Sequence, residues 1–271
     1  MHSIITITTD FGPGNKGIGV MHAVIQRICP DVHVINLAQD VPGFDVRAGA
    51  RLLEAIAFVP AAAHICVVDP GVGTKRRALI LITKRGDALV GPDNGVLIPA
   101  TNSLGGIVKA FEVTNPTWML QPVSAIFHGR DVFAPTAAHI AAGKNPADAG
   151  SAIDSKTLAP APFPEAKYRH QAIEAEVIDM NSYGNVFLNI RAEEMHKLAT
   201  IGNTIKLSAG ANQILLPYLR TFGEVPVNSP VIIDDDFGRI EVAVNQGNFA
   251  EALGIDRGQE IILRVTLTGA D

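Results

Sequence analysis

Five parts of the chain combine charged residues, aromatic residues and glycines in patterns that could perform chemistry. The first is TTDFG at residues 8–12, where Asp10 follows an apolar run and precedes a glycine-rich stretch. An ionised carboxylate has two oxygens and can accept both hydrogen bonds of a ribose diol, so Asp10 is a candidate ribose ligand. Asp10 could equally cap a helix that begins near Gly17. This segment alone leaves both interpretations open.

The second part is VVDPGVGTKRR at residues 67–77, which places a carboxylate and two guanidinium groups around a tight turn. The Pro-Gly pair and a second glycine favour the turn, which lets Arg76 and Arg77 fold back toward Asp69. A carboxylate that faces a guanidinium at the end of a strand could be a structural ion pair or part of a site.

Two further parts are a turn-like motif and a segment with a histidine. GPDNG at residues 91–95 is most simply a turn. FHGRDVFAP at residues 127–135 places His128 beside Phe127 just before a helix, where backbone N–H groups and the aromatic ring could hold a ligand. The alternative is a structural histidine, because a lone histidine more often serves the fold.

The last part consists of three motifs, NSYGN at 181–185, DDDFG at 234–238 and VNQGN at 244–248. Three consecutive aspartates suggest a metal ion at first sight. Successive side chains of a strand point to opposite faces, however, and the chain has neither a His–Cys cluster nor the spacing of an EF-hand loop. We therefore expect no metal site.

The elements that must position these residues follow from periodicity. The first 145 residues alternate short β-branched runs with longer helical patterns, which predicts a mainly parallel α/β sheet. Ligands of such sheets collect beyond the carboxyl ends of the strands, where Asp10 and Asp69 both stand. The expected strands cover residues 4–9, 32–37 and 64–69, and the expected helices cover 17–29 and 45–59.

The chain changes character after about residue 145. Prolines are frequent up to residue 168, and beyond it short β-like runs are separated by Gly, Asn and Pro. We therefore expect an N-terminal α/β domain over residues 1–150, a Pro-rich linker over 151–168, and a smaller, compact C-terminal β-rich domain over 169–271.

Composition excludes several classes of protein. Of 271 residues, 47% are hydrophobic and 18% are charged, the balance of an ordinary globular protein. The net charge of −5 and the lack of Lys/Arg runs argue against binding to nucleic acid or to an anionic membrane. The apolar runs are shorter than the roughly 20 residues that span a bilayer. Two cysteines are too few for a disulfide scaffold and the first residues lack a secretion signal, so we expect a cytoplasmic protein with reduced thiols.

Taken together, the motifs are more specific than any one of them. In order and spacing, TTDFG, AQDVPGFD, VVDPGVGTKRR, GPDNG, FHGRDVFAP, SYGN and RIEVAVNQGN resemble the S-adenosylmethionine hydroxide adenosyltransferases, or adenosylmethionine hydrolases. These enzymes are relatives of the chlorinating and fluorinating S-adenosylmethionine enzymes. The resemblance extends from about Ile4 to Leu267. It implies an N-terminal α/β domain, a smaller C-terminal β-barrel-like domain, and a homotrimer with active sites between the N-terminal domain of one subunit and the C-terminal domain of its neighbour.

The resemblance also implies a reaction and three catalytic residues. Water or hydroxide attacks C5′ of the ribose of S-adenosyl-L-methionine, displaces L-methionine and leaves adenosine. The Asp–Arg–His set of the hydrolases corresponds to Asp69, Arg76 and His128. S-adenosyl-L-methionine is then the small-molecule substrate, and no cofactor is implied.

Residues that bind the substrate follow from the same resemblance. They are Asp10 for the ribose hydroxyls, Phe44 and Phe127 beside the nucleoside, Tyr183, Asn185 and the backbone around Gln246 for adenine, and Asn181 and Asp236, with Phe237 next to it, toward methionine. Two positions depart from the family, because Asn181 stands where relatives usually have Asp and Asp236 where they tend to have Ser. We hypothesise that the acidic partner of the methionine ammonium has moved from position 181 to Asp236, with Asp179 as the alternative.

Two other functions stay open on the sequence alone. In the halogenating members the histidine position resembles Tyr, and an insertion follows the Gly-Val-Gly turn. Here His128 is present, residues 74–76 follow the turn directly, and Gly129 replaces a Ser, so water is favoured over chloride as the nucleophile. A non-catalytic sensor of adenosine or S-adenosylmethionine is the other alternative, and the presence of all three catalytic residues argues against it.

Overall fold

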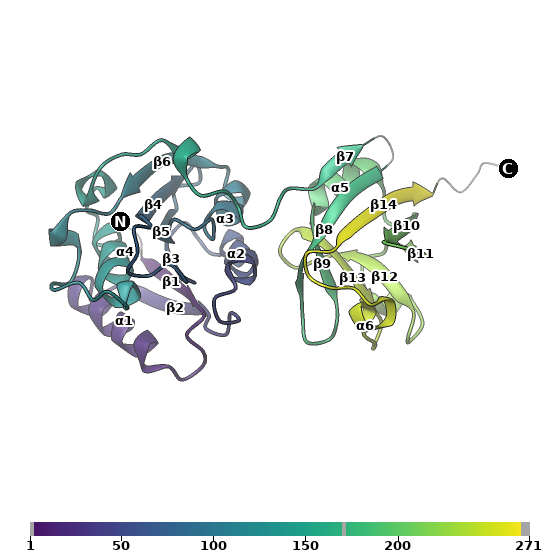
Figure 1. Cartoon of the computed structure of the whole chain (residues 1–271), viewed down its shortest axis with the longest axis horizontal. Coiled ribbons are helices and arrows are strands. Elements are labelled where there is room, and N and C mark those ends of the chain that lie inside the picture. The colour runs from purple at the N-terminus through teal and green to yellow at the C-terminus, as the bar shows by residue number, and fades with distance from the viewer. Residues whose placement is uncertain (1–2, 170–171, 267–271) are drawn as a thin grey trace. The chain divides into compact units, whose positions relative to one another are not determined.

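The structure, a computed structural model, describes residues 3–169 and 172–266. The chain divides into two compact units after Pro162 (Figure 1). Each unit has its own cluster of buried apolar side chains, as expected of a domain. Within the described residues, no helix combines the length and the apolar character needed to cross a membrane.

The first unit is built on a six-stranded sheet. Its strands are β1 (Ile4–Thr9), β2 (His33–Ala38), β3 (Ala63–Val67), β4 (Ala78–Thr83), β5 (Ala88–Pro92) and β6 (Ile107–Glu112). They lie in the order β2-β1-β3-β5-β4-β6, in which β2, β1, β3 and β5 pair in parallel and β4 is antiparallel to both of its neighbours. The expectation of a mainly parallel α/β sheet is confirmed, with one reversed strand.

Helices cover both faces of this sheet. The α-helices are α1 (Lys16–Ile28), α2 (Val46–Leu53), α3 (Ile98–Ser103) and α4 (Ala134–Ala141), and the shorter helical turns are η1 (Glu54–Phe58), η2 (Pro116–Trp118), the π-helical η3 (Gly129–Phe133), η4 (Pro146–Ala149) and η5 (Ser155–Thr157). Figure 1 shows α1 and α4 beside the sheet. Successive side chains of a strand point to opposite faces, so Ile5, Ile7 and Ile65 share a core with residues of α1 and α4. Val68 points to the other face, where Gly49 of α2 packs against it.

The proline-rich segment that follows η4 belongs to the first unit as far as Pro162. The N–H of Ile153 donates to the carbonyl of Ala110 in β6 at 2.9 Å, and the N–H of Ala159 donates to Asp93 at 2.9 Å. The prolines have no N–H to donate, but the residues between them find acceptors on the first unit. Residues 151–162 of the expected linker are therefore packed onto this unit.

The second unit is an antiparallel β structure. Its strands are β7 (Lys167–Arg169), β8 (Ala172–Met180), β9 (Val186–Arg191), β10 (Thr204–Ala209), β11 (Asn212–Pro217), β12 (Pro230–Asp234), β13 (Arg239–Val244) and β14 (Glu260–Thr266), with α5 (Ala192–Leu198), α6 (Phe249–Leu253) and η6 (Phe222–Glu224) between them. They lie in the order β11-β10-β14-β8-β9-β13-β12, and β7 pairs with β8. The N–H of Leu219, just after β11, donates to Ile232 of β12 at 2.9 Å, so the sheet nearly closes. The expected barrel-like fold is confirmed.

Candidate active site

The carboxyl ends of the parallel strands bring two predicted residues together. Thr9 at the end of β1 is paired with Val67 at the end of β3, so the residues that follow both strands emerge at one edge of the sheet. Asp10 and Asp69 line a cavity of about 440 Å³ at this edge. The other predicted residues that line it are Phe44, Phe127 and His128. The tertiary structure thus collects five of the predicted residues in one place.

Asp10 fixes the aromatic side of this cavity. Its Oδ2 accepts a hydrogen bond from the N–H of Phe44 at 2.9 Å. Phe44 has a positive φ of 63° and an exposed ring, so this bond holds a strained turn with an apolar side chain at the mouth of the cavity. The cap of α1 is Asn15, whose Oδ1 accepts from the N–H of Gly17 at 2.8 Å. Capping of α1 therefore leaves Asp10 available at the strand end.

Asp69, Arg76 and His128 form one connected group. The guanidinium Nε of Arg76 lies 3.0 and 3.1 Å from the two carboxylate oxygens of Asp69, and a terminal nitrogen of Arg76 makes a further short bond to Asp69 Oδ2. The same terminal nitrogen lies 2.9 Å from Nδ1 of His128. Arg76 therefore bridges a carboxylate and an imidazole that lie 59 residues apart in the chain.

This bridge determines the state of the imidazole. A guanidinium has only donors, so Nδ1 of His128 must accept, and a neutral ring then carries its proton on Nε2. Burial lowers the pKa of His128, and the positive charge of Arg76 lowers it further, against the opposing effect of Asp69 and Asp131. His128 is accordingly neutral near pH 7.

Two loops approach closely to build this group. Gly73 has a positive φ of 75°, and a Cβ at this position would lie 2.2 Å from the carbonyl oxygen of Ala125. Only glycine lets the loop that carries Arg76 lie against the loop that carries His128. Asp131 secures the second loop, because its Oδ2 accepts from the N–H of Ser124 at 2.8 Å. Asp131 also forms an ion pair with Arg130, whose Nε lies 2.6 Å from its Oδ1.

Sequence reasoning missed Asn15, which also lines the cavity. The signal that could have found it is GPGNKG at residues 12–17, which has the G-x-G-x-x-G spacing of a glycine-rich turn between a strand and a helix. A Cβ on Gly17 would lie 3.1 Å from the ring of Phe127, so the missing side chain lets α1 begin directly against the cavity wall.

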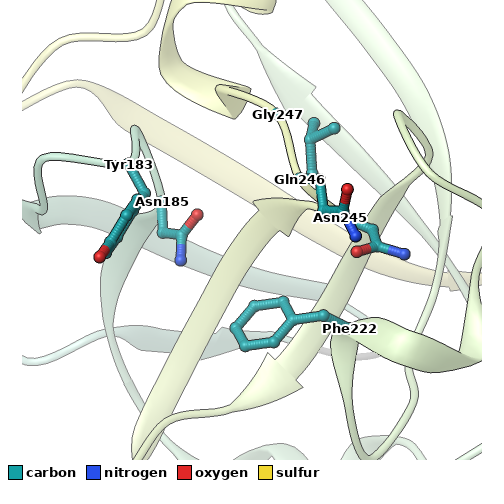
Figure 2. Close-up of a pocket in the computed structure, with 7 residues that line it drawn as sticks. Tyr183, Asn185, Phe222, Asn245, Gln246 and Gly247 are labelled. Carbon is teal, nitrogen blue, oxygen red and sulfur yellow. The ribbon is translucent and has the colours of Figure 1, made fainter.

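The second unit has its own cavity, which gathers the residues expected to meet adenine. Tyr183 and Asn185 lie across from Gln246, and the cavity measures about 520 Å³ (Figure 2). The Nδ2 of Asn185 donates to Glu241 at 2.6 Å, while the ring of Tyr183 is 75% exposed and available for stacking. Phe222 of η6 also lines this cavity and was not foreseen.

The residues expected near methionine lie in two separate turns of this unit. Oδ1 of Asn181 accepts from the N–H groups of Tyr183 and Asn185 at 3.1 and 3.0 Å, so it shapes the turn. Asp236 and Phe237 stand in the turn between β12 and β13, at the opposite end of β13 from Gln246. None of these three residues lines the cavity of Tyr183, although Asn181 belongs to the turn that carries this tyrosine.

Two of the three consecutive aspartates make hydrogen bonds with nearby groups of the same unit. Asp234 accepts from the hydroxyl of Tyr218 and lies 2.8 Å from Nε2 of His196, and Asp235 accepts from the N–H groups of Phe237 and Arg239. In the parts of the chain that the structure describes, no group of three His, Cys, Asp or Glu side chains is arranged to hold a metal ion.

Residues 5–150 match the model of the SAM (S-adenosylmethionine) hydroxide adenosyltransferase N-terminal domain, and residues 175–262 match the model of its C-terminal domain. The chain belongs to the SAM hydroxide adenosyltransferase family. All three members of the connected group, Asp69, Arg76 and His128, lie in the part that matches the N-terminal model.

Individual members of the SAM hydroxide adenosyltransferase family align over almost the whole chain. An (R)-S-adenosyl-L-methionine hydrolase of Salinispora tropica is 41% identical over 266 residues, which cover 97% of both chains. The hydrolase of the same name from Thermus thermophilus is 36% identical over 94% of this chain and 97% of its own. A fluorinase of Actinoplanes sp. is 24% identical over 98% of each chain. An uncharacterized conserved protein from Thermotoga maritima shares the fold, with a TM-score of 0.88, 30% identity and coverage of 96% and 99%.

Proposed function

We propose that this member of the family hydrolyses (R)-S-adenosyl-L-methionine to adenosine and L-methionine. The observation that carries the proposal is the cavity at the strand ends, which Asp10, the expected ribose ligand, lines together with Asp69 and His128. Relatives that align over almost the full length bear the name of this hydrolase.

The reaction forms one bond and breaks one. A water oxygen attacks C5′ of the ribose, the C5′–S bond breaks, and its electron pair stays on sulfur as the neutral thioether of L-methionine. The leaving group is already a sulfonium, so the difficulty lies in the nucleophile, because water has a pKa near ~15.7. The residues around the cavity must therefore give the water hydroxide character.

The hydrogen bonds of the connected group suggest how this is done. Nδ1 of His128 accepts from Arg76, so the Nε2–H is the part of the ring that can donate to the attacking oxygen and orient it. The carboxylate oxygens of Asp69 accept from Arg76 and keep further lone pairs, which can receive a proton from water. Arg76 fixes both groups and lowers the cost of negative charge beside them. The side chains of Asp69 and Arg76 are only 4% and 10% exposed. Because little water reaches the ion pair, the attraction between its charges is weakened less than it would be at the surface.

We also propose that the active enzyme is a homotrimer in which each active site combines the cavity of Asp10 in one subunit with the cavity of Tyr183 in its neighbour. The support is that the nucleoside residues divide between two cavities of about 440 and 520 Å³, one in each unit. In this assembly Asp10 would hold the ribose diol, Phe44 and Phe127 would flank the nucleoside, and Tyr183, Asn185 and Gln246 would meet adenine.

For the methionine ammonium, we propose Asp236 as the acidic partner. The alternative, Asp179, already forms an ion pair with Arg257 at 2.8 Å, whereas Asp236 is exposed at its turn. Asp236→Ser is then expected to raise KM for the substrate roughly tenfold while kcat changes little, since one charge-assisted contact contributes about 1.5–3 kcal/mol. A KM equal to that of the natural protein would disprove this role, and Asp256→Ser, on another exposed turn, is the control.

The function is tested by product analysis. The purified protein is incubated with the (R) and (S) epimers of S-adenosyl-L-methionine, with and without chloride, beside His128→Ala and Asp69→Ala variants. We expect adenosine and methionine from the (R) epimer, independent of chloride and lost in both variants. A 5′-chloro-adenosine product would indicate a halogenase instead, and bound but unconverted substrate would indicate a sensor.

A further inference from the structure

The motif GPDNG at residues 91–95 contacts the loop that carries Asp69 and Arg76. Strand β5 is placed between β3 and β4 in the sheet, so the chain that leaves β3 must cross the end of β5 to enter β4. The crossing segment contains Asp69 and Arg76, and the residues that come directly after β5 are Asp93 and Asn94.

Asn94 holds the first end of the crossing segment. Its Nδ2 donates to the carbonyl oxygen of Val68 at 2.8 Å, and this carbonyl belongs to the peptide that leads into Asp69. Its Oδ1 accepts from the N–H of Val96 at 3.2 Å, which fixes the orientation of the amide. The side chain therefore connects the turn after β5 to the backbone immediately before Asp69.

Asp93 holds the other end. Its Oδ2 lies 2.7 Å from Nε and 2.6 Å from a terminal nitrogen of Arg77, and its backbone N–H donates to the carbonyl of Arg77 at 3.0 Å. The same carbonyl accepts from the guanidinium of Arg76 at 3.3 Å. Asp93 therefore holds the carbonyl oxygen of Arg77 in place, and the guanidinium of Arg76 donates to this same oxygen.

The turn at residues 91–95 is also held by the segment that ends at Pro162. Gly95 has a positive φ of 90°, and a Cβ there would lie 2.0 Å from the carbonyl oxygen of Pro160. The second oxygen of Asp93 accepts from the N–H of Ala159. Residues 159 and 160 are therefore packed directly against the turn.

We propose that Asn94 and Asp93 are positioning residues for the reaction, which set the distance between Asp69 and Arg76 by holding both ends of the segment that carries them. This proposal rests on the proposed hydrolase function. Neither side chain lines the cavity at the strand ends; each acts through the backbone or side chain of its neighbour. Loss of either bond is expected to reduce the rate of the bound complex rather than the affinity for substrate.

The test compares Asn94→Ala with Asn115→Ala. Asn115 is also half-buried and makes bonds of the same kind, since its Nδ2 donates to the carbonyl oxygen of Asp148 at 2.8 Å and its Oδ1 accepts from the N–H of Thr117 at 3.0 Å and from the Thr117 hydroxyl at 2.9 Å. We expect Asn94→Ala to lower kcat on the order of tenfold with KM within about twofold, because small misplacements of reacting groups cost this much. Asn115→Ala is expected to keep both constants while losing a similar amount of thermal stability. Equal kcat values for the two variants would overturn the proposal.

A second variant and a second readout separate positioning from general damage. Asn94→Asp keeps the acceptor for Val96 and replaces the donor to Val68 by a carboxylate oxygen that repels this carbonyl, so it should lower kcat in the same direction even if Asn94→Ala fails to fold. Hydrogen exchange measured by mass spectrometry should show faster exchange in residues 68–77 for both Asn94 variants and not for Asn115→Ala. Unchanged exchange there would contradict the proposal whether or not the protein hydrolyses the substrate. If exchange in residues 68–77 becomes faster as expected but the natural protein forms no adenosine, the proposed hydrolase function is rejected. The finding that Asn94 holds this segment would still stand.

Discussion

At the scale of single residues, the chemistry depends on which nitrogen of His128 is free. Nδ1 accepts from Arg76 at 2.9 Å, and this bond exists only while that nitrogen has no proton. Protonation of the ring would put a hydrogen between two cationic groups and detach His128 from Arg76, while the bonds between Arg76 and Asp69 would remain. Under the proposed function, His128 would act as a neutral donor through its Nε2–H, and its contact with Arg76 depends on its protonation state.

This gives a prediction about pH. Burial and the charge of Arg76 lower the pKa of His128, so the ring should stay neutral below pH 6.5 and kcat/KM should fall only at more acidic pH. Nitrogen NMR of the labelled protein, with His128→Gln to assign the signal, should show the tautomer with a proton on Nε2. A midpoint above 6.5, or a proton on Nδ1, would contradict the bridge. The signal of His33, an exposed residue, provides the internal comparison.

Asn181 is expected to contact the substrate, but its side chain also shapes the turn that carries Tyr183. The resemblance places a substrate contact at this position, whereas the structure shows its oxygen accepting from the N–H groups of Tyr183 and Asn185. An aspartate could accept the same two bonds, so the departure from the family leaves the turn intact. The ring of Tyr183 is therefore presented in the same way with either side chain.

At the scale of elements, the candidate site is a contact between two loops, and Gly73 permits it. Gly73→Ala should separate the loops, because the new Cβ would lie 2.2 Å from the carbonyl oxygen of Ala125. We expect kcat to fall on the order of tenfold or more as His128 moves away from Arg76.

The control is Gly86→Ala. Gly86 also has a positive φ, of 99°, but an added Cβ has nothing within 4 Å. Both variants should lose about 1 kcal/mol of stability from the left-handed backbone, Gly73→Ala should lose more because of its contact with Ala125, and only Gly73→Ala should lose activity. Steady-state kinetics beside urea denaturation measures both effects; equal losses of activity would show that the loop contact is unimportant.

The opposite end of the sheet is held by a buried polar network. Asp87 accepts from Thr83 and from Arg85 at 3.0 and 2.8 Å and lies 3.1 Å from Nε2 of His64, whose Nδ1 is 2.8 Å from Thr6. Burial alone would raise the pKa of Asp87, but the bonds and charges of His64 and Arg85 outweigh it and hold the pKa well below its ordinary value. The network ties three strands together away from the site.

Asp87→Asn should therefore destabilise the protein without changing kcat. A loss of about 3 kcal/mol is expected at pH 7, because one partner of a buried charged group is removed. The unfolded chain binds more protons than the folded one, so this contribution is present above the unfolded pKa of about 3.9 and shrinks as the pH falls below it. Urea denaturation at pH 7 and pH 3 measures the difference. Asp154→Asn, on an exposed turn, should be neutral, and a pH-independent loss for Asp87→Asn would refute the linkage.

At the scale of the whole molecule, the division of the nucleoside residues between two units leads to a complementation test of the proposed trimer. His128→Ala disables the cavity of the first unit, and Asn185→Ala disables the cavity of the second. Each variant alone should be inactive. When they are mixed one to one and reassembled, roughly one quarter of the sites combine two intact cavities, and this share of activity should return. No return of activity from mixed oligomers would argue against shared sites.

The sequence by itself determined the fold class, the family and the residues at the strand ends. Hydrophobic periodicity is a local property, so β1, α1, β2, α2 and β3 could be read directly from it. The motifs around Asp10, Asp69 and His128 were identified because their order and spacing are written in the chain.

Only the tertiary structure decided which of these residues meet. Arg76 and His128 are 52 positions apart, and Asp236 lies at the opposite end of β13 from Gln246 although nine intervening residues separate them in sequence. GPDNG looks like a plain turn until β5 is known to lie between β3 and β4, which places Asn94 under the loop of Asp69. Strand order and loop contacts depend on long-range packing, in which each pairing is selected by the whole core, and no local pattern records that selection.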